Sequence, residues 1–376
     1  MFAPLTKRDF ASASTAARLY LRPTAFIDRP HELDDACLRI ADTMLWFAAW
    51  HISLRDGAHI RSAVVAVPDL DEWIVAMPDA LAEGAGAQRA ALAHPRGALQ
   101  LGDRTIRLAE PQIMGILNIT PDSFSDGGKH IDAAAAIDAG FAMGAAGAAI
   151  VDVGGESTRP GAETLWEGDE IKRIEPVVAA LAKGGVAVSV DTRKAAVMEA
   201  ALAAGAGVIN DISALRYDDR ALELMAASSC PIILMHAPSA GSNPHEGGDY
   251  VHALFDVYDM LAERIAACEA AGIARSRLIL DPGIGFGKGV GENLDLLNGL
   301  ALFHTLGCPL LFAASRKRLI GALDNEAPAD ARLGGSIALH YQAADRGAQL
   351  LRVHDVPETR QALRMWRALR DAALTR

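Results

Sequence analysis

The sequence predicts an α/β protein made of a (β/α)8 TIM barrel preceded by a small α/β N-terminal extension. From about residue 111 onward, eight short apolar runs alternate with stretches of helical character. These eight units occupy roughly 265 residues, close to the ~250 residues that a (β/α)8 barrel typically uses. A doubly wound open sheet is the alternative, but eight units without a clear dinucleotide-binding loop favour a closed barrel.

Each apolar run is interpreted as a buried strand, because it is short, rich in aliphatic or β-branched residues, and bounded by Gly, Pro or Asp. The runs cover residues 113–120, 148–155, 186–192, 207–213, 231–236, 278–283, 309–315 and 348–356. Ala- and Leu-rich helices are expected between them at 132–146, 194–205 and 250–272. The last helix carries an apolar stripe that indicates core packing. Its members are Val251, Leu254, Phe255, Tyr258, Leu261 and Ile265.

Residues 1–95 differ in pattern and are expected to form the extension, with residues 96–376 forming the barrel domain. Helices are predicted at 32–54 and 69–93, with one short strand between them. The role of the extension stays open, since it carries no catalytic constellation. A hairpin is expected at 97–108, where two short strands flank a Gly-Asp turn, and it is placed to plug the amino-terminal end of the barrel.

Composition and charge exclude several classes of protein. The formal net charge of -11 argues against a general binder of nucleic acid or of anionic membranes. No uncharged apolar run reaches the ~20 residues needed to span a bilayer, and the first residues lack the apolar core of a signal peptide. A cytoplasmic protein is therefore expected. The cysteines form no CxxC pair, so neither a disulfide framework nor a structural zinc site is expected.

Polar residues stand at the end of nearly every predicted strand. They are Asn118, Asp152, Asp191, Asn210, His236, Asp281, Ser315, Arg352 and His354. In a (β/α)8 barrel the chemistry lies at the carboxyl ends of the strands. Polar groups in such a place must be hydrogen-bonded or used in binding, which predicts a ligand site at this end.

Several of these segments suit an anionic ligand. Asn118 opens a long polar loop and can offer an amide oxygen to Mg2+, a cation that prefers oxygen ligands and phosphate. Thr158 and Arg159 follow the second strand and supply a hydroxyl and a cation for phosphate or carboxylate. A cationic group follows the seventh and eighth strands, where many barrels bind phosphate. It comprises Arg316, Lys317, Arg352 and His354.

A second set of strand ends suits a flat, hydrogen-bonding heterocycle. Asp191, Asp281 and Asn210 offer acceptors and one donor, which match the ring N–H, amino and carbonyl groups of a pterin edge. Aspartates that cap their own turns remain the alternative interpretation.

Other mechanisms find less support in the sequence. The run DPGIGFGK (281–288) is not a Walker A loop, because Gly289 follows Lys288 where Ser or Thr is required. His236 has no second histidine at metal-ligand spacing, and no GxSxG elbow is present. Zinc hydrolysis and acyl transfer are therefore poorly supported.

The chain resembles the dihydropteroate synthases in segments that occur in the family's order: GILNITPDSFSDGG, DVGGESTRPGA, VDTRK, INDIS, LMH, LDPGIGFGK, SRK and RVHDV. The resemblance covers about residues 97–376. The first two segments are highly specific, and the others also support the wider group of pterin-binding barrels. The resemblance implies a homodimeric, Mg2+-dependent enzyme of folate biosynthesis. It would condense (7,8-dihydropterin-6-yl)methyl diphosphate with 4-aminobenzoate to give 7,8-dihydropteroate and diphosphate.

The resemblance also implies three groups of site residues. The pterin would be held by Asp191, Asn210, Met235, Asp281, Phe286, Lys317 and Arg352. The diphosphate would meet Asn118, Thr158, Arg159, Arg352 and His354, with Mg2+ bridging Asn118 and the diphosphate. The 4-aminobenzoate would border Phe124, Thr158, Pro160, Ser315 and Lys317. Ile284 and Arg318 depart from the commonest family form, in which Phe and Ser are frequent.

Two other functions share part of this pattern. A methyltetrahydrofolate-dependent corrinoid methyltransferase uses the same barrel, but it does not need the TPDSFSDGG and ESTRPGA loops, and no cobalamin module is visible. A non-catalytic pterin-binding paralogue would be expected to lose one of Asn118, Thr158, Lys317 or Arg352, and all four are present.

Overall fold

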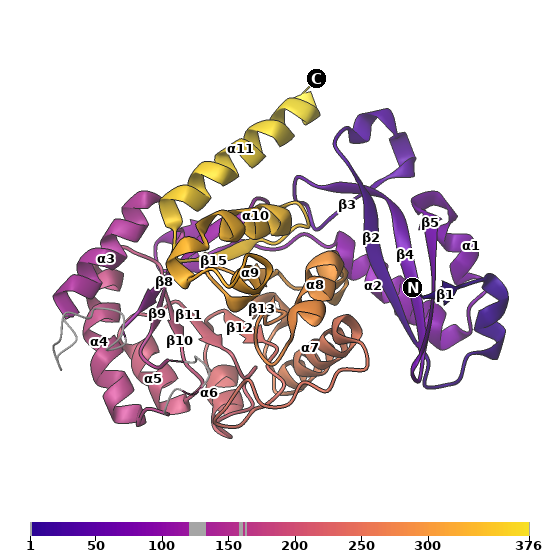
Figure 1. The fold of residues 1–376 in the computed structure, drawn as a ribbon. Coiled ribbons are helices and arrows are strands. Elements are labelled where there is room, and N and C mark those ends of the chain that lie inside the picture. Colours follow the sequence, from indigo (N-terminus) through magenta and orange to yellow (C-terminus); the bar gives the residue numbers. More distant parts are fainter. Residues whose placement is uncertain (1, 120–132, 158–160, 162–163, 376) are drawn as a thin grey trace.

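The computed structural model describes residues 2–119, 133–157, 161 and 164–375 (Figure 1). Phe124, Thr158, Arg159 and Pro160, which the sequence assigns to the ligand site, lie outside the described residues. Within the described part of the chain, no helix combines the length and the apolar character that crossing a membrane requires.

The predicted eight-stranded barrel is confirmed. Its strands are β8 (Gln112–Asn118), β9 (Ile150–Gly154), β10 (Val188–Asp191), β11 (Val208–Asp211), β12 (Ile232–Met235), β13 (Leu278–Asp281), β14 (Leu311–Phe312) and β15 (Leu350–Val353). They are parallel neighbours in the order β13-β12-β11-β10-β9-β8-β15-β14. A parallel bridge between Leu280 and Leu310 joins the two ends of this order, so the sheet closes on itself.

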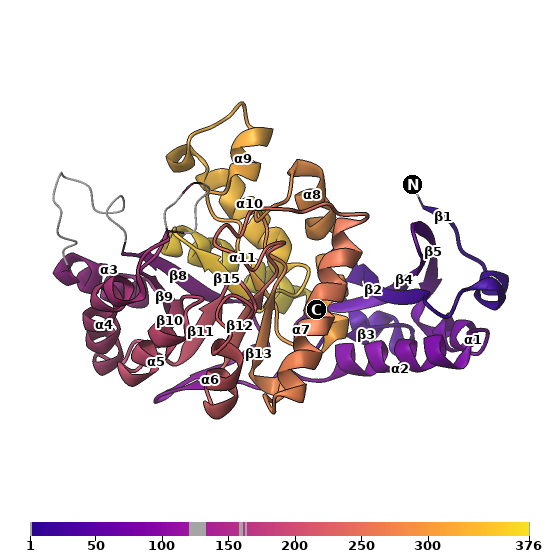
Figure 2. The ribbon, with the colours of Figure 1, turned by 90° about the horizontal axis from the view of Figure 1, so that it is seen from below.

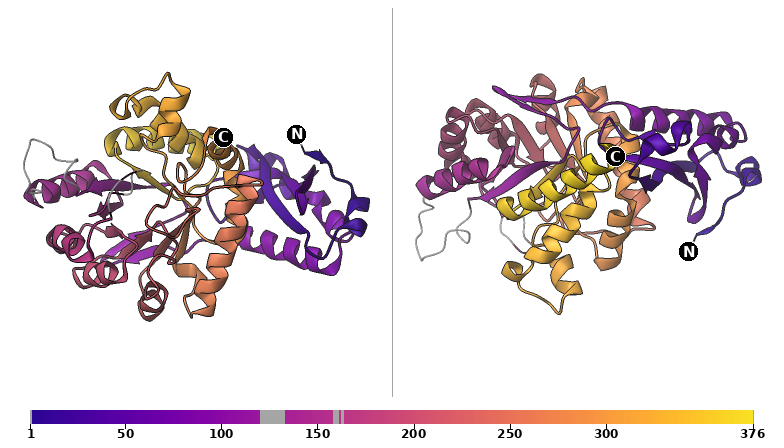
Figure 3. Two further views of the ribbon diagram at one scale, coloured as in Figure 1. Left: turned by 60° about the horizontal axis from the view of Figure 1, so that its bottom comes forward. Right: turned by 90° about the horizontal axis from the view of Figure 1, so that it is seen from above.

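Helices surround the strands, as the left view of Figure 3 shows. Those of the barrel domain are α3 (Ala133–Ala146), α4 (Glu167–Lys183), α5 (Ala195–Ala203), α6 (Ala221–Ala227), α7 (Ala253–Ala270), α8 (Val290–Gly299), α9 (Arg318–Leu323), α10 (Leu333–Ala344) and α11 (Val356–Thr375). The apolar stripe of α7 is buried as predicted, except at one position. Val251 precedes the helix and is 65% exposed, so its inclusion in the stripe was wrong.

The hairpin predicted at 97–108 forms from β6 (Leu99–Leu101) and β7 (Arg104–Ile106). Its apolar side chains pack in one buried cluster with residues of the barrel strands and of the segments that lead into them. The cluster comprises Leu99, Leu101, Ile106, Leu108, Met114, Ile150, Ala187, Val208, Ile233, Ile279, Leu311, Ala313 and Leu350. The hairpin therefore fills the amino-terminal end of the barrel, and the polar strand ends lie at the opposite end.

The extension is richer in strands than the sequence predicts. The strands β2 (Arg18–Ile27), β4 (Trp46–Asp56) and β5 (His59–Ala66) form an antiparallel sheet with β4 in the middle. The short strand β1 (Ala3–Pro4) pairs with β5 in parallel, and β3 (Leu38–Arg39) pairs with the start of β4. Two helices complete it, α1 (Leu70–Ile74) and α2 (Asp79–Ala93). The helix predicted at 32–54 was wrong, because β4 occupies its second half. Pairing of the aromatic and β-branched residues of β4 with strands on both sides outweighs the helical propensity of the alanines.

The extension lies against the outer face of α7, on the side of the barrel away from α3 and α4 (Figures 1 and 2). Tyr20 of β2 stacks on Phe255 with ring centroids 4.2 Å apart and donates a hydrogen bond of 3.0 Å to Asp259. Arg18 pairs with the same carboxylate at 2.8 Å, and Arg55 pairs with Asp256 at 2.6 Å. An aromatic stack flanked by ion pairs thus fixes the extension to the barrel.

Candidate active site

The polar strand ends meet at one level of the barrel because the strands are parallel and in register. Asp191 is the register partner of Asn210 on one side and of Gly154 on the other, and Gly154 is also the partner of Asn118. Asp281 pairs with Met235 in the same way. Residues far apart in the sequence are thereby brought to a common carboxyl-terminal face, as the strand pattern predicts.

Arg352 connects three of these strand ends. Its Nε atom donates to Oδ2 of Asp152 at 2.6 Å, and its Nη2 atom donates to Oδ2 of Asp191 at 2.8 Å. The Nδ2 atom of Asn210 donates to the same Oδ2 of Asp152 at 3.0 Å. Asp152 is completely buried, so it orients both the guanidinium and the amide. This hydrogen bond uses one N–H of the Asn210 amide and fixes which way the amide faces, so its Oδ1 atom and its second N–H remain for a ligand.

Two largely buried carboxyl groups dominate the electrostatics of the site. Burial raises the pKa of Asp191 to about 7, while Arg352 acts in the opposite direction. Burial also raises the pKa of Asp281, although Lys317 and the N–H of Gly283 favour its charged form. Charged carboxylates that have lost solvent gain strongly from a ligand that donates N–H groups to them. The arrangement is therefore suited to binding a donor-rich heterocycle.

A lysine and an apolar wall stand beside these carboxylates. The Nζ atom of Lys317 donates to the carbonyl of Ile284 and lies 4.8 Å from the ring centroid of Phe286. Burial lowers the pKa of Lys317 to about 8, with Asp281 opposing that shift. Phe286 packs on a small buried cluster that includes Met235. Cationic, aromatic and thioether groups thus line one side of the site.

Contrary to the sequence prediction, the cationic residues that follow the seventh and eighth strands do not all belong to one group. The hydroxyl of Ser315 accepts a hydrogen bond from the backbone N–H of His354 at 3.1 Å and contacts the Nδ1 atom of that residue at 3.0 Å. These two residues are therefore neighbours, as expected. Arg316 instead pairs with Asp355, at 3.0 Å from its Nε atom. The predicted cationic group is thus partly neutralised, because the guanidinium of Arg316 has its own carboxylate.

His236 also has a structural partner. Its Nδ1 atom lies 3.0 Å from the Nζ atom of Lys288, which further donates to the carbonyls of Gly283 at 2.8 Å and Phe286 at 3.1 Å. Burial lowers the pKa of Lys288 to about 7. Gly283 has a φ of +68°, and a Cβ there would lie 1.9 Å from the carbonyl oxygen of His236. The glycine and the lysine together fix the loop that carries Phe286.

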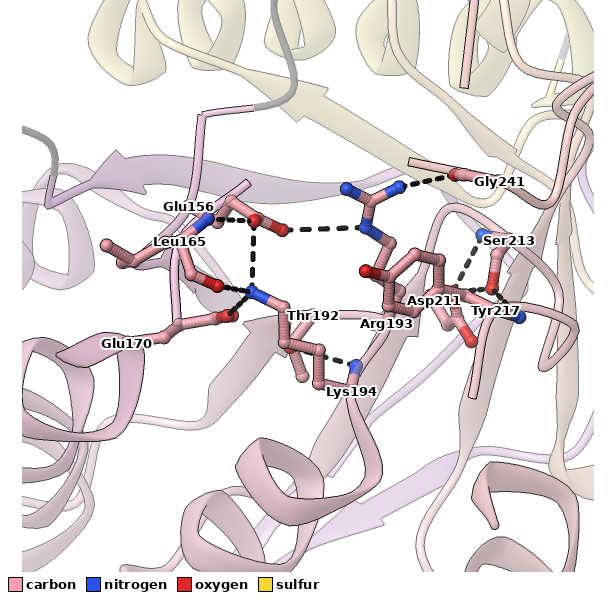
Figure 4. Close-up of polar contacts among 10 residues, drawn as sticks. All are labelled: Glu156, Leu165, Glu170, Thr192, Arg193, Lys194, Asp211, Ser213, Tyr217 and Gly241. Carbon is pink, nitrogen blue, oxygen red and sulfur yellow. Dashed lines mark hydrogen bonds and ion pairs between the residues drawn. The ribbon is translucent and has the colours of Figure 1, made fainter. Parts of the chain in front are cut away.

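Sequence reasoning missed a buried ionic cluster beside the site, which Figure 4 shows. Lys194 binds Glu156 at 2.9 Å and Glu170 at 2.7 Å, and Arg193 lies 3.5 Å from Glu156. The signal was present in the VDTRK and GGES segments, where two cations and a carboxylate occur among buried residues. Their pairing depends on how the loops return to the barrel, which no spacing in the sequence reveals.

The barrel domain is similar to known proteins over most of its length. The family model described as pterin binding enzyme matches residues 114–354. The dihydropteroate synthase of Escherichia coli is 45% identical over 269 residues, which cover 71% of this chain and 95% of that protein. A probable bifunctional folylpolyglutamate synthase/dihydropteroate synthase of Haloferax volcanii is 47% identical over 260 residues, but these cover only 30% of that longer protein and 69% of this chain.

Solved structures agree with these sequence relatives. Dihydropteroate synthase of Xanthomonas albilineans with 4-aminobenzoic acid is 45% identical and has a TM-score of 0.69, over 73% of this chain and 98% of that chain. The same enzyme in complex with 7,8-dihydropteroate has a TM-score of 0.65 at 42% identity, over 72% of this chain and 98% of that chain. The similarity is thus carried by the barrel domain.

Proposed function

The chain belongs to the dihydropteroate synthases of the pterin-binding enzyme family, and from this premise we propose which of its residues bind the substrates. The reaction condenses (7,8-dihydropterin-6-yl)methyl diphosphate with 4-aminobenzoate, and it gives 7,8-dihydropteroate and diphosphate in folate biosynthesis. One observation carries the proposal: largely buried acceptors from separate strands meet Arg352 and Lys317 at the carboxyl-terminal end of the barrel.

The pterin is assigned to the deepest set of groups. Asp191, Asp281 and Oδ1 of Asn210 are acceptors for the amino and ring N–H groups of the heterocycle. The Asp281 residue is 4% exposed, and the Asp191 side chain is 14% exposed. Hydrogen bonds from the pterin would therefore replace the water contacts that these two carboxylates lose on folding. Lys317 is the donor for the pterin carbonyl and ring nitrogen. The remaining members of this set are Met235, Phe286 and Arg352, which are assigned to the faces of the ring.

The diphosphate is assigned to Asn118, Arg352 and His354, together with Thr158 and Arg159. An Mg2+ ion fits beside Asn118, whose Oδ1 atom is a hard oxygen ligand at the end of β8. A Cβ at Gly154 would lie 3.3 Å from that oxygen, so glycine leaves space next to it. When bound, the ion neutralises charge on the diphosphate.

The 4-aminobenzoate is assigned to the entrance side of the pterin, near Ser315 and Lys317, with Phe124, Thr158 and Pro160 completing its surroundings. Ser315 supports this placement, because its hydroxyl is held by His354, a residue assigned to the diphosphate. The arylamine would then stand next to the carbon from which the diphosphate departs.

The chemistry follows from these positions. The bond between the pterin methylene carbon and the diphosphate oxygen breaks, and the amine lone pair forms the new C–N bond. Arg352, His354 and Arg159 stabilise the charge that the leaving diphosphate acquires. Asp191 and Asp281 stabilise the positive charge that develops on the pterin. The new C–N bond leaves a proton on nitrogen, which passes to solvent, so the amine needs positioning more than deprotonation.

A matched pair of variants tests the assignment. Arg352→Met removes the guanidinium that Asp152 and Asp191 orient, whereas Arg316→Met removes a neighbouring guanidinium that pairs with Asp355. With Mg2+ and both substrates, the purified wild type should form dihydropteroate and diphosphate. Arg352→Met should lose at least about 100-fold in kcat/KM, and Arg316→Met less than about fivefold. Equal losses in the two variants would contradict the assignment, and a folded wild type without turnover would indicate a non-catalytic paralogue.

We also propose a homodimer that forms through the late helices α10 and α11. Met365 and Leu369 are 57% and 63% exposed, and their i,i+4 spacing puts them on one face of α11. Leu333, at the start of α10, is exposed as well. Neighbouring apolar side chains in solvent are typical of an interaction surface. Sedimentation of Met365→Glu/Leu369→Glu should show a monomer where the wild type shows a dimer, and an unchanged dimer would place the interface elsewhere.

The cytoplasm is the compartment that we propose. The four cysteines, Cys37, Cys230, Cys268 and Cys308, are thiols rather than halves of disulfides. Thiols throughout a chain are usual where the surroundings are reducing. The proposed partners are accordingly small-molecule substrates, without nucleic acid or membrane.

A further inference from the structure

The turn that follows β14 has a backbone conformation that its residue types do not favour. The carbonyl of Ala314 accepts a hydrogen bond of 3.3 Å from the N–H of Lys317, which closes a four-residue turn. Arg316, the third residue of this turn, has a φ of +57°. Glycine or asparagine is usual at such a position, because most side chains are strained in the left-handed region. Contacts from outside the turn must therefore stabilise this conformation.

Two residues at the start of α10 supply those contacts. The Oγ atom of Ser336 accepts a hydrogen bond from the backbone N–H of Arg316 at 2.9 Å. The Nη1 atom of Arg332, the residue before the helix, donates to the backbone carbonyl of Arg316 at 2.9 Å. Ser336 also donates to the carbonyl of Arg332 at 2.8 Å. The N–H and the carbonyl of Arg316 are thus both bound by one connected network.

The fold keeps these two side chains in place. Ser336 is buried, and the Nε atom of Arg332 donates to the carbonyl of Ala327 at 2.7 Å. The guanidinium of Arg332 also packs on Gly321 of α9, where a Cβ would lie 2.5 Å from its Nη2 atom. Helices α9 and α10 lie side by side (Figures 1 and 2). The turn that leads into α9 is therefore bound to residues whose own positions are fixed.

The turn carries a residue of the site on each side of Arg316. Before it, the Oγ atom of Ser315 accepts a hydrogen bond from the backbone N–H of His354 at 3.1 Å. After it, the Nζ atom of Lys317 lies 4.8 Å from the ring centroid of Phe286. One turn thus directs two side chains toward different loops. A change of φ at Arg316 would rotate one of them relative to the other.

Lys317 lies within electrostatic reach of the groups assigned to the pterin. Burial lowers its pKa to about 8, whereas Asp281 and Asp191 act to raise that pKa and Arg352 acts to lower it. Charges have such effects on one another when the groups are close and have lost solvent. The conformation of the turn therefore brings the ammonium group among the strand-end carboxylates.

We propose that Arg332 and Ser336 are positioning residues for pterin binding. They hold Arg316 in the left-handed conformation, and this conformation directs Lys317 into the site. The inference rests on the proposed function, in which Lys317 is a donor to the pterin. Both residues act through the backbone of Arg316 and not by contact with the substrate. The guanidinium of Arg316 pairs with Asp355 and takes no part in this arrangement.

The first test is Ser336→Ala in the full-length protein. It removes the acceptor for the N–H of Arg316, so the calorimetric Kd of the pterin diphosphate with Mg2+ should rise at least about fivefold. Ser228→Ala is the matched control, because that hydroxyl also donates to a carbonyl and accepts an N–H. Ser228 lies between α6 and β12, at the amino-terminal end of the barrel, so its loss should leave the Kd within about twofold of the wild type.

A second substitution separates positioning from general stability. Glycine adopts a positive φ without strain, so Arg316→Gly makes the turn less dependent on α10. Ser336→Ala/Arg316→Gly should therefore bind the pterin diphosphate at least about threefold more tightly than Ser336→Ala. A serine that only stabilised α10 would give a loss that glycine does not restore.

Arg332→Met covers the case in which water replaces the hydroxyl of Ser336. It removes the donor to the carbonyl of Arg316, so it should weaken pterin binding in the same direction. A Kd within about twofold of the wild type in both Ser336→Ala and Arg332→Met overturns the inference, and so does a loss that Arg316→Gly fails to reduce. Lys317→Met tests the proposed function separately. Unchanged pterin affinity in that variant would remove Lys317 from the pterin site, whatever the α10 variants show.

Discussion

The guanidinium Nε atom of Arg352 lies 2.6 Å from Oδ2 of Asp152, a carboxylate with no exposed surface. The two residues come from strands separated by β8 in the barrel, and the same oxygen accepts Nδ2 of Asn210. The buried carboxylate of Asp152 thus orients both the guanidinium of Arg352 and the amide of Asn210. Asp152 therefore influences how the pterin is recognised, although the atoms assigned to the ligand belong to its neighbours.

Asp152→Asn should reduce kcat/KM about 10- to 100-fold and lower the free energy of unfolding by about 1–3 kcal/mol. The amide oxygen can still accept from both Arg352 and Asn210, because they bind the same oxygen, but the negative charge that pairs with the buried guanidinium is lost. Steady-state kinetics and urea unfolding measure the two effects. Asp355→Asn is the control, because it removes a carboxylate from the more exposed Arg316 pair. Wild-type kinetics in Asp152→Asn would show that the orientation of Arg352 does not matter for turnover.

Asp191→Ala and Asp281→Ala should each weaken pterin binding by a few kcal/mol, roughly the penalty of leaving a buried donor without its charged acceptor. Both carboxyl groups are desolvated enough for the protein to raise their pKa. Calorimetric titration with the pterin diphosphate measures the loss directly. Near-wild-type affinity in both variants would mean that the pterin binds elsewhere. Asp218→Ala, at a partly exposed turn before α6, provides a control for loss of a carboxylate.

The fragment 96–376 should retain turnover wherever it stays soluble, because all residues assigned to substrates lie within it. It should also unfold at a lower temperature than the full chain. Removing the extension exposes Phe255 and leaves Asp256 and Asp259 without Arg55 and Arg18. Thermal unfolding and steady-state assays separate the two effects. A soluble, dimeric fragment without turnover would show instead that residues 1–95 contribute to the active site.

His304 should make the protein sensitive to acid. It is fully buried, its Nε2 atom contacts the carbonyl of Arg346 at 2.9 Å, and burial lowers its pKa to about 3. A histidine in the unfolded chain has a pKa of about 6.5. Below that pH His304 therefore binds a proton in the unfolded chain but not in the folded chain. The contribution of the neutral, buried His304 to the free energy of unfolding is therefore fully present above about pH 6.5. It should fall by up to about 1.4 kcal/mol per pH unit toward about pH 3.

His304→Gln removes that proton uptake, since glutamine does not titrate. Urea unfolding at about pH 7.5, 6.5 and 5.5 should show the stability difference between the wild type and His304→Gln narrowing below about pH 6.5. His59→Gln, at an exposed position in β5, should run parallel to the wild type. A constant difference between the wild type and His304→Gln at all three pH values would rule out His304 as the source.

The barrel and its polar strand ends were predictable because their signals are local. A run such as LILD, with an apolar strand and a terminal aspartate, specifies both a buried strand and a polar exit. The strand β4 was not predictable in this way, because the segment WFAAWHISL is compatible with a helix or a strand. Its pairing with β2 and β5 selects the strand. The partners of Arg316 and Lys194 were unpredictable for a related reason. Side-chain pairing across loops depends on positions that only the folded chain defines.

The hairpin β6–β7 affects the order in which the two substrates can enter the barrel. Its apolar side chains fill the amino-terminal end of the barrel, so the substrates assigned to the carboxyl end share a single entrance with the product. The pterin groups at the strand ends are the innermost, and 4-aminobenzoate is assigned to the outer position. A molecule that occupied the outer position first would obstruct the inner one. We therefore expect excess 4-aminobenzoate to slow pterin entry, which makes it an inhibitor as well as a substrate at high concentration.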